Sequence, residues 1–279
     1  MKKRANPILM AVIYITCIIL TILSIYPFLV MFVNATRNSA QVQSNPISLI
    51  PSKYLFYNLK VFEGKSFDPM KGLMNSFVIS ASSTILTIYF STLTAFAIVA
   101  YNWKLRNAFY TFILAVMMLP AQVTAIGFYQ LMYKLGLTNN LLALILPAIA
   151  APATVFFMRQ FMIPALPMEI VQSARVDGAG EFRTFNQIVL PIMKPAMATQ
   201  AIFSFVASWN NLFMPSILLT DTDKYTMPVM VSLLKGDIYK TEFGTVYLGL
   251  AITVLPLFII YFLLSKYIIA GVALGGVKG

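Results

Sequence analysis

Residues 163–195 read IPALPMEIVQSARVDGAGEFRTFNQIVLPIMKP, a patterned stretch that is too polar to span a membrane and too regular for a plain loop. Pro167 is suited to open a short helix, because a proline at the first helical position gives up no hydrogen bond that the helix needs. Glu169 follows in the first turn, where a negative charge suits the helix dipole. Asp177-Gly178 predicts the end of this helix, with Gly178 in the left-handed conformation that glycine adopts without strain.

A second helix is predicted from about Gly180. Apolar residues recur in it at three-to-four residue spacing, which predicts one apolar face: Phe182, Phe185 and Ile188 or Val189. Pro191 is expected to end the helix, because it cannot donate the next backbone hydrogen bond. Two short helices joined by a glycine turn outside the membrane indicate a docking element for another protein. An amphipathic hairpin that lies on the lipid headgroups is the alternative that stays open.

The composition on either side of this stretch is that of a membrane protein. Hydrophobic residues make up 59% of 279 positions and charged residues 10%, with a mean hydropathy of +0.80, whereas soluble domains carry about 25% charge. A helix needs about 20 apolar residues to cross the bilayer core. Six stretches are expected to do so, and residues 1–279 are predicted to form a single all-α transmembrane domain. The stretches are approximately Ile8–Val33, Leu73–Ala100, Ala108–Gly127, Leu141–Ile163, Pro195–Leu219 and Thr245–Tyr267.

The basic residues set the expected orientation. Met1-Lys2-Lys3-Arg4 precedes an apolar run that is too long for a cleaved signal, which predicts an uncleaved first span and a cytoplasmic N-terminus. The segments 101–107, 164–194 and 268–279 are then cytoplasmic as well, and the segment 34–72 is an external loop. The formal net charge of +11 is spread singly between apolar runs, which argues against nucleic acid as a partner.

Several kinds of chemistry are missing from the chain. It has no histidine and one cysteine, Cys17, so a zinc site is not expected. The predicted spans hold essentially no acidic or basic residue, whereas ion-coupled transporters and voltage sensors need charge inside the membrane. There is no phosphate-binding G-x-x-x-x-G-K-[ST] loop either. A membrane enzyme would need clustered histidines or carboxylates near the interface. A transport protein of this composition must therefore take its energy from a partner.

The stretch at 163–195 resembles the coupling-helix motif of the permease subunits of ABC importers, which reads Glu-Ala-Ala, three residues, Gly, nine residues, Ile-x-Leu-Pro. Gln172-Ser173-Ala174 stand where the family has Glu-Ala-Ala. Arg175-Val176-Asp177-Gly178-Ala179 match the next part, and Ile188-Val189-Leu190-Pro191 match the end. Nine residues separate Gly178 from Ile188, as in the motif. Gln172 keeps the size and hydrogen bonding of the family's glutamate but not its charge, so a contact of that carboxylate is not implied here.

Further stretches look like the carbohydrate branch of these permeases, and most of all like the shorter, six-span subunit of maltose-type importers. They are Tyr26-Pro27-Phe28, Asn75-Ser76, Trp209-Asn210 and the terminal residues 266–279. The resemblance implies a type I ABC importer permease fold in the bacterial cytoplasmic membrane, with both termini cytoplasmic. The implied partners are a second permease in a heterodimer, a cytoplasmic ATPase dimer and an extracytoplasmic sugar-binding protein.

In such an importer this chain binds no cofactor and is not itself an enzyme, because ATP and magnesium are held by the ATPase. The resemblance assigns the ATPase-coupling role to Glu169, Gln172, Ser173, Ala174, Arg175, Asp177, Gly178, Ala179, Leu190 and Pro191. The solute is expected to be a sugar, in particular an oligosaccharide. A glycerol phosphoester or other solute is the alternative within transport, and a membrane scaffold without transport activity is the alternative outside it.

Two polar faces are candidates for the pathway. Seven hydroxyls fall mostly on one face of the second span, where small residues are more typical of close helix packing than of a pore: Ser76, Ser80, Ser83, Thr84, Thr87, Ser91 and Thr94. In the fifth span, Gln200, Ser204, Ser208 and Asn211 are expected on a face that meets protein or water, since burying amides in lipid costs several kcal/mol. Asn210 lies beside them, and Trp209 is either a stacking surface for a sugar or an interfacial anchor.

Overall fold

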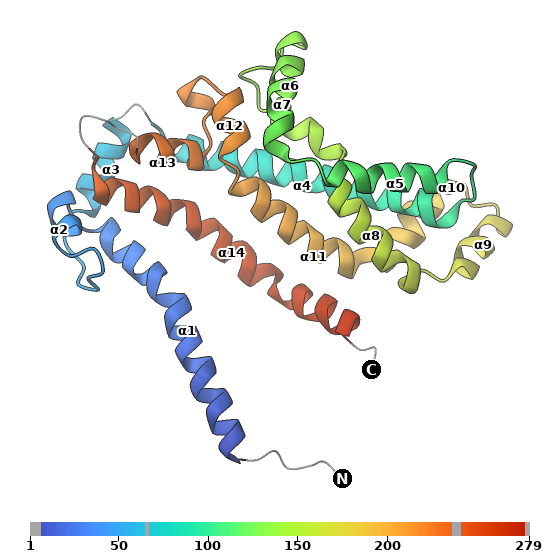
Figure 1. Cartoon of the computed structure of the whole chain (residues 1–279), viewed down its shortest axis with the longest axis horizontal. Helices are drawn as coiled ribbons and strands as arrows, with labels where there is room; N and C mark the ends of the chain where they lie inside the picture. Colours follow the sequence, from blue (N-terminus) through green and yellow to red (C-terminus); the bar gives the residue numbers. More distant parts are fainter. Residues whose placement is uncertain (1–6, 65–66, 236–240, 277–279) are drawn as a thin grey trace. The chain divides into compact units, whose positions relative to one another are not determined.

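The computed structural model describes residues 7–64, 67–235 and 241–276, and each regular element in these ranges is a helix (Figure 1). The elements in chain order are α1 (Pro7–Ala35), α2 (Ser39–Ser44), α3 (Leu55–Gly64), α4 (Pro69–Ala100), α5 (Arg106–Met117), α6 (Ala121–Lys134), α7 (Leu142–Ile145), η1 (Leu146–Ile149), α8 (Pro152–Ala165), α9 (Met168–Val176), α10 (Glu181–Thr184), η2 (Phe185–Val189), α11 (Leu190–Trp209), α12 (Phe213–Leu218), η3 (Thr222–Lys224), α13 (Met227–Lys235) and α14 (Phe243–Gly276). The chain divides into two compact units, unit 1 with Met1–Pro69 and Met230–Leu255, and unit 2 with Met70–Val229 and Pro256–Gly279.

The prediction of an all-α membrane protein is confirmed. Within the described residues, five helical stretches are long and apolar enough to cross a membrane: Ile8–Ala35, Pro69–Ala100, Leu142–Ala165, Glu181–Trp209 and Phe243–Phe262. A sixth is obtained if α5 and α6 together make one broken span. Each of the six expected spans therefore coincides with helix, although their bounds and continuity differ.

The stretch expected to span the membrane at residues 108–127 is broken in the structure. Here α5 ends at Met117, and α6 leaves at an angle of 104°. Pro120 stands directly before α6 in an extended conformation (φ −63°, ψ 128°) and has no N–H to continue the ladder of α5. Met118 and Leu119 close the end of α5 with hydrogen bonds to the carbonyls three residues back.

The predictions for Pro191 and for the fifth span also need correction. Pro191 does not end the second helix, because Glu181–Trp209 runs as one helical stretch. Its middle part, η2, is a π-helix, whose wider turn passes directly into α11 with Pro191 in the first turn. A proline there withholds an N–H and crowds the preceding turn, and the wider π turn accommodates both effects. At the other end the stretch stops at Trp209, and the separate helix α12 follows after a break.

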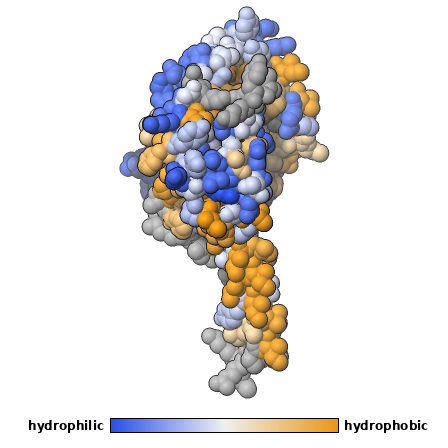
Figure 2. Space-filling model, turned by 90° about the vertical axis from the view of Figure 1, so that its left-hand side faces the viewer, coloured by the Kyte–Doolittle hydropathy of each residue, from blue (hydrophilic) through white to orange (hydrophobic). Residues whose placement is uncertain are grey.

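Unit 1 is built on α1, whose apolar side chains are exposed along nearly its whole length. Ile8, Ile22 and Leu23 are 72%, 60% and 64% exposed, and this surface is the largely orange lower part of Figure 2. Such a surface suits lipid rather than water. Only the C-terminal end of α1 is covered, where Met31 and Ala35 pack with Leu248 and Ala251 of α14.

The segment after α1 was expected to be a loop but contains two helices. Asn38 caps α2 in a capping box, since its side chain accepts from the Gln41 N–H while the Gln41 side chain accepts from the Asn38 N–H. Arg37 is 7% exposed and donates to Asn34 Oδ1 (2.8 Å) and to the carbonyls of Asn45 and Gln41 (2.7 Å each). A buried arginine with these bonds fixes the path of the backbone from 34 to 45.

Unit 2 has an apolar core where α4, α8, α9, η2 and α11 meet. Its buried members are Ile88, Ala95, Phe96, Met158, Met162, Leu166, Val171, Phe185, Val189, Met193 and Ala196. The hydroxyl face of α4 lies against protein: Thr87 donates to the Ala148 carbonyl (2.9 Å), and the Ser76 hydroxyl accepts from the Met227 N–H (2.9 Å). These bonds favour packing over a pore role for that face.

Candidate functional site

The turn at Gly178 ends α9 with a complete Schellman motif. Gly178 has φ +80°, its N–H donates to the Arg175 carbonyl (3.0 Å), and the N–H of Ala179 donates to the Ala174 carbonyl (2.9 Å). A Cβ at this position would meet no atom within 4 Å. Glycine is therefore required here by the backbone conformation and not by crowding. The predicted left-handed turn is confirmed, as is Glu169 in the first turn of α9.

The inner face of the helical pair α9–α10 is held in the core of unit 2. Val171 and Phe185 are fully buried, and Ala174 is 7% exposed. Phe185 stacks on Phe96 of α4, with ring centroids 5.8 Å apart. Burial of one large apolar side chain contributes about 1.5–3 kcal/mol, so a few such contacts fix the pair to the ends of α4, α8 and α11.

A polar cluster crosses the base of the turn. Arg175 Nε lies 2.8 Å from Glu181 Oε1, its guanidinium carbon lies 5.0 Å from the ring centroid of Tyr101, and the Tyr101 hydroxyl donates to Glu181. Burial and then the bond to Glu181 raise the pKa of Tyr101 above its ordinary value, so this phenol stays protonated and keeps donating. The bond to Glu181 likewise raises the pKa of Arg175. The cluster thus joins α9, α10 and the residue that follows α4.

The outer face of the pair is open. The side chains of Glu169, Gln172, Ser173 and Asp177 are exposed, and Val176 is 87% exposed. Of the other residues assigned to coupling, Gly178 and Pro191 are exposed, Arg175, Ala179 and Leu190 are half-buried, and Ala174 is buried. Two shallow hollows of about 340 and 370 Å³ flank this face, and Ser173 and Asp177 line both.

One part of the expected apolar face of the second helix is wrong. Phe182 does not share the buried face of Phe185 and Val189, because it is 72% exposed. Thr184 is buried instead. The π-helical turn over residues 185–189 has more residues per turn than an α-helix, so the residues before it do not continue the buried face of the residues after it. Phe182 and Val176 are therefore two large apolar side chains on the open surface near the turn.

Unit 2 also contains a cavity of about 600 Å³ where three helices break. It is bounded by the α5–α6 bend, by the start of α8 and by the residues between α11 and α12; Leu119, Thr124, Pro152, Asn211 and Met214 are among its lining residues. Non-helical backbone at membrane depth is tolerated only inside protein or beside a water-filled cavity. Three breaks around one cavity, in stretches apolar enough to span, fit that requirement.

The predicted polar face of the fifth span is only partly brought to this cavity. Asn211 lines it, but it lies beyond the end of α11 and is not part of the same helix face as the others. Gln200, Ser204 and Ser208 are half-buried on α11 and do not line it, and Asn210 caps the helix end. Trp209 is 2% exposed and stacks on Phe205 at 5.6 Å, which favours packing over contact with a solute.

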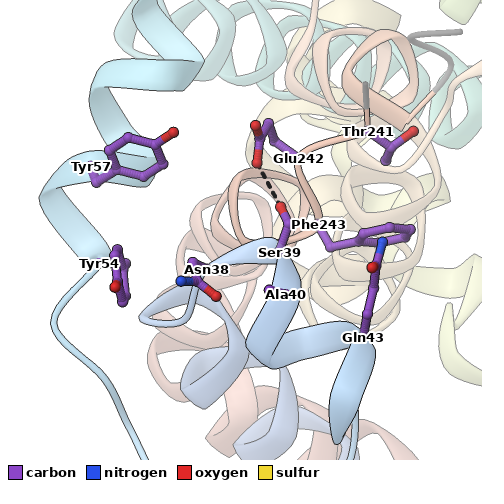
Figure 3. Close-up of a pocket in the computed structure, with 9 residues that line it drawn as sticks. All are labelled: Asn38, Ser39, Ala40, Gln43, Tyr54, Tyr57, Thr241, Glu242 and Phe243. Atoms are coloured by element: carbon purple, nitrogen blue, oxygen red, sulfur yellow. Dashed lines mark hydrogen bonds between the residues drawn. The ribbon is translucent and has the colours of Figure 1, made fainter. Parts of the chain in front are cut away.

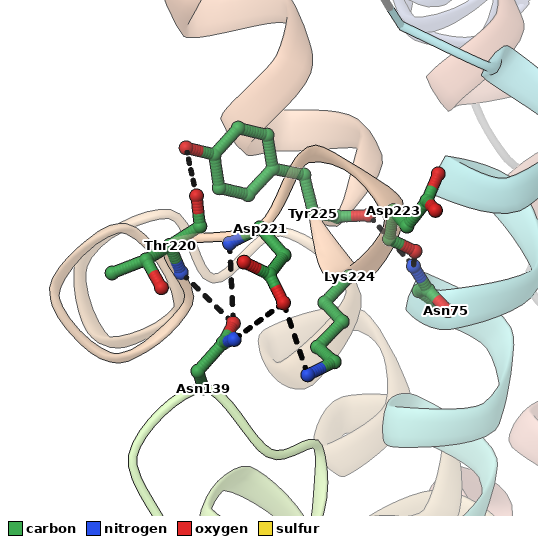
Figure 4. A network of polar contacts seen from close by, with 7 residues as sticks. All are labelled: Asn75, Asn139, Thr220, Asp221, Asp223, Lys224 and Tyr225. Carbon is green, nitrogen blue, oxygen red and sulfur yellow. Dashed lines mark hydrogen bonds and ion pairs between the residues drawn. The ribbon is translucent and has the colours of Figure 1, made fainter.

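A polar network lies at the other end of α4 (Figure 4). Asn139, with φ +56°, accepts from the N–H groups of Thr220 and Asp221 (3.1 Å each) and donates to Asp221 Oδ2 (2.6 Å). Lys224 pairs with the same carboxylate at 3.2 Å. The bond from Asn139 and then Lys224 lower the pKa of Asp221 below its ordinary value.

The same segment is tied to α4. Asn75 donates to the carbonyls of Asp223 (2.9 Å) and Tyr225 (3.1 Å), and Lys71 pairs with Asp223 at 2.7 Å. The network thus holds residues 219–226 at the N-terminal end of α4, while Tyr101 and the helical pair lie at its C-terminal end. Asn75 and Tyr101 are 26 residues apart along α4 and the residue that follows it, so the two sites are separated by about 40 Å at 1.5 Å per residue.

Neither the Tyr101–Arg175–Glu181 cluster nor the Asn139–Asp221 network was predicted from the sequence. The only signal for the first is a pair of opposite charges that bracket the Asp177-Gly178 turn, six residues apart. Tyr101 is 80 residues from Glu181, and Asn139 is 82 residues from Asp221, so no local periodicity reports either contact.

Comparison with known proteins identifies the family of the chain. Residues 87–273 match the family model described as binding-protein-dependent transport system inner membrane component. The chain is 34% identical over 281 residues to the arabinooligosaccharides transport system permease protein AraQ of Halalkalibacterium halodurans, and the alignment covers 100% of each chain. It is 32% identical to the lactose transport system permease protein LacG of Rhizobium radiobacter, over 92% of each chain.

A further relative carries a different solute in its name. The sn-glycerol-3-phosphate transport system permease protein UgpE of Yersinia pestis is 31% identical, over 92% of this chain and 94% of its own. Among solved structures, a chain of a bacterial ABC transporter involved in the import of the acidic polysaccharide alginate superposes with a TM-score of 0.79 at 20% identity. That match covers 96% of this chain and 99% of the other. At this identity the structural match establishes the fold.

Proposed function

The chain belongs to the inner membrane components of binding-protein-dependent transport systems, and from this premise we propose that it is one permease subunit of an ATP-driven sugar importer. It forms half of a translocation pathway with a second permease. An ATPase dimer hydrolyses ATP on the cytoplasmic side, and a binding protein delivers the sugar on the other. The chain lies in the bacterial cytoplasmic membrane with both termini in the cytoplasm, and it binds no cofactor.

The observation that carries the proposal is the braced helical pair α9–α10. Its inner face is locked to α4, α8 and α11 by buried side chains, and its outer face leaves Gln172, Ser173 and Val176 exposed. The partly exposed Arg175–Glu181 pair adds less than about 1 kcal/mol, so the apolar contacts supply most of the stiffness. A stiff element with an open face transmits displacement: when a docked ATPase moves α9, the three helices behind it must follow.

The three broken helices supply the part that responds. α5 and α6 meet at 104°, and helical structure is interrupted before α8 and between α11 and α12, all beside the same cavity. Such breaks let half-helices reorient without stretching a continuous hydrogen-bond ladder. We place Asn211 on the solute path, because it is the one residue of the predicted polar face that reaches this cavity. The half-buried Gln200, Ser204 and Ser208 are then part of the subunit interface or of another state of the path.

Charge favours a sugar over a glycerol phosphoester. Recognition of phosphate normally uses arginine or lysine, and no lysine or arginine is among the residues that line the cavity. The arabinooligosaccharide and lactose permeases among the relatives agree with this choice. The glycerol-3-phosphate relative keeps the second candidate open to test, since the partner permease can also contribute residues.

Site-specific cross-linking tests the coupling role directly. Cys17 is replaced by serine, and a photo-reactive group is attached at Gln172→Cys on the open face of α9. Lys134→Cys, exposed at the end of α6, is the matched control, because it lies toward the Asn139 network. We expect the Gln172 probe to capture the ATPase from native membranes and the Lys134 probe to capture none.

Capture at both positions would mean that cross-linking occurs wherever the ATPase is near and does not identify α9 as its docking site. Capture at neither, in a preparation that retains the ATPase, would refute docking through α9. Mass spectrometry of the co-purified chains then identifies the second permease and the binding protein. Uptake of labelled arabinooligosaccharide against glycerol 3-phosphate in reconstituted vesicles decides between the two solute classes.

A further inference from the structure

Unit 1 contains a hollow of about 690 Å³ that the proposed transport cycle does not use (Figure 3). It is lined by Asn38, Ser39, Ala40, Gln43, Tyr54, Tyr57, Thr241, Glu242 and Phe243. In Figure 3 the tyrosines stand on one side and Glu242 on the other, with the Tyr57 ring extending from α3 toward Glu242. The volume falls within the roughly 300–1,000 Å³ typical of small-molecule sites.

The walls of this hollow are held in place by bonds beneath it. Ser39 donates to Glu242 Oε2 (2.6 Å), which joins the start of α2 to the residue before α14. Asn58 is 2% exposed and donates to the carbonyls of Ala35 and Arg37 (2.9 Å each). Gly244 lies so close to Asn58 that a Cβ there would come within 2.7 Å of its Nδ2. The hollow therefore exists without any rearrangement.

The lining groups suit a neutral sugar. A pyranose or furanose ring offers an apolar C–H surface, which packs on the faces of aromatic rings such as Tyr54 and Tyr57. Its hydroxyls both donate and accept, and the carboxylate and amide groups of Glu242, Asn38 and Gln43 offer matching acceptors and donors. None of the nine described lining residues is a lysine or arginine. Recognition of phosphoesters and uronates normally uses such a cation, so the described lining favours a neutral solute.

We propose that this hollow is a low-affinity holding site for one or two residues of a neutral oligosaccharide. The proposal rests on the proposed sugar import, and it gives this subunit a direct sugar contact outside the cavity of unit 2. The segment 34–72 is expected outside the cell membrane, so the hollow faces the side from which the sugar is delivered. The proposal also specifies the chemical class of the cargo, since a site that excludes anions serves a neutral oligosaccharide.

Saturation-transfer difference NMR tests the site in the full chain with its co-purified partners. The complex is placed in lipid nanodiscs without any maltoside detergent, which is itself a sugar. The probes are arabinotriose and lactose as neutral sugars, and glycerol 3-phosphate and an alginate trisaccharide as anions. We expect saturation transfer to ring C–H protons of the neutral probes, about tenfold weaker binding in Tyr57→Ala, and none to the anions.

Tyr133→Ala is the matched control, because Tyr133 is a 69%-exposed tyrosine that lines no part of this hollow. It should bind as the native chain does. Size-exclusion profiles confirm that the variants are folded, and Tyr57→Phe offers a milder change should the alanine variant fail this check.

Equal transfer in the native chain and in Tyr57→Ala, or transfer to the anions as strong as to the sugars, overturns the proposal. A Tyr57→Ala complex that loses the binding protein but keeps saturation transfer to the sugars also overturns the proposal, because Tyr57 then contacts the binding protein and not a sugar. Saturation transfer measures sugar binding alone and needs neither transport nor ATP. Absent transfer in a complex that still imports sugar therefore refutes the holding site alone, whereas a complex that imports no sugar refutes the proposed function.

Discussion

Replacing Gly244 by alanine should destabilise unit 1, because the space that a side chain would need at this position is already occupied. A Cβ at this position would lie 2.7 and 2.9 Å from the side-chain nitrogen and oxygen of Asn58, and closer still to the Arg37 carbonyl oxygen. Ordinary contact begins at 3.4 Å, so Asn58 Nδ2 would have to withdraw by at least 0.7 Å. That movement breaks its bonds to the carbonyls of Ala35 and Arg37.

The magnitude follows from these contacts. Overpacking costs about 1–3 kcal/mol, and leaving a buried hydrogen-bonding group without its partner costs about 1–3 kcal/mol more. The better helix propensity of alanine returns about 1 kcal/mol. The net loss is then about 1–5 kcal/mol, and a value of about 3 kcal/mol corresponds to a fall in Tm of roughly 10 °C for a chain of this size.

The assay is a thermal melt of the purified protein in nanodiscs, with hydrogen exchange of residues 30–64 as the local readout. Gly127→Ala in α6 is the matched control, because a Cβ there meets nothing within 4 Å, and it should gain up to about 1 kcal/mol. A Gly244→Ala melt within 2 °C (about 1 kcal/mol or less) of the native protein, or equal to that of Gly127→Ala, would show that the Arg37–Asn58 framework is not rigid and would refute the reasoning.

Three further predictions concern unit 2. Gly178→Leu should lower sugar uptake at least about tenfold while insertion and basal ATPase activity persist, because a leucine in the left-handed conformation costs roughly 1–2 kcal/mol. Gly178→Asn is the control, because asparagine tolerates the φ of +80° better. Unchanged uptake in the leucine variant would contradict the coupling role. Asn211→Leu should reduce uptake without reducing the amount of assembled complex, and full uptake would remove Asn211 from the solute path. Because the pKa of Asp221 is lowered, its ionised form stabilises the loop above the ordinary aspartate pKa of about 3.9, and this stabilisation is lost as the pH falls through the lowered pKa. Amide hydrogen exchange of residues 219–226 should therefore be slow from pH 8 to 5, and its protection should be lost only below the ordinary aspartate pKa. In Asp221→Asn the protection should be weaker and independent of pH.

Apolar runs and a single turn could be predicted from the sequence because their causes are local. The first, second, fourth and sixth spans follow from run length alone, and Asp177-Gly178 predicted a left-handed turn that only glycine forms easily. Proline was less informative. Pro120 breaks the third span while Pro191 sits inside a continuous helix, since the outcome depends on whether the neighbouring turn widens to accommodate the ring.

The residues that brace the candidate site were beyond prediction for a different reason. Tyr101 meets Glu181 across 80 residues, and the exposure of Phe182 depends on a π-helical register shift that no hydropathy pattern encodes. Sequence could place Gln172, Ser173 and Asp177 on an open face near the turn. It could not separate Asn211, at the cavity, from Ser204 and Ser208 on the helix before it.

The make-up of unit 1 has a consequence for biogenesis. Its core joins Met31 and Ala35 near the start of the chain to Leu248 and Ala251 near the end, so that core cannot be completed until the ribosome has delivered the last span. Contacts of such long sequence separation form late. A nascent chain with α1 inserted and α14 still missing carries Arg37 and Asn58 without the backbone that covers them. Truncations before residue 255 should therefore be removed by membrane proteases, whereas pulse-chase labelling should show the full-length chain gaining resistance in one late step.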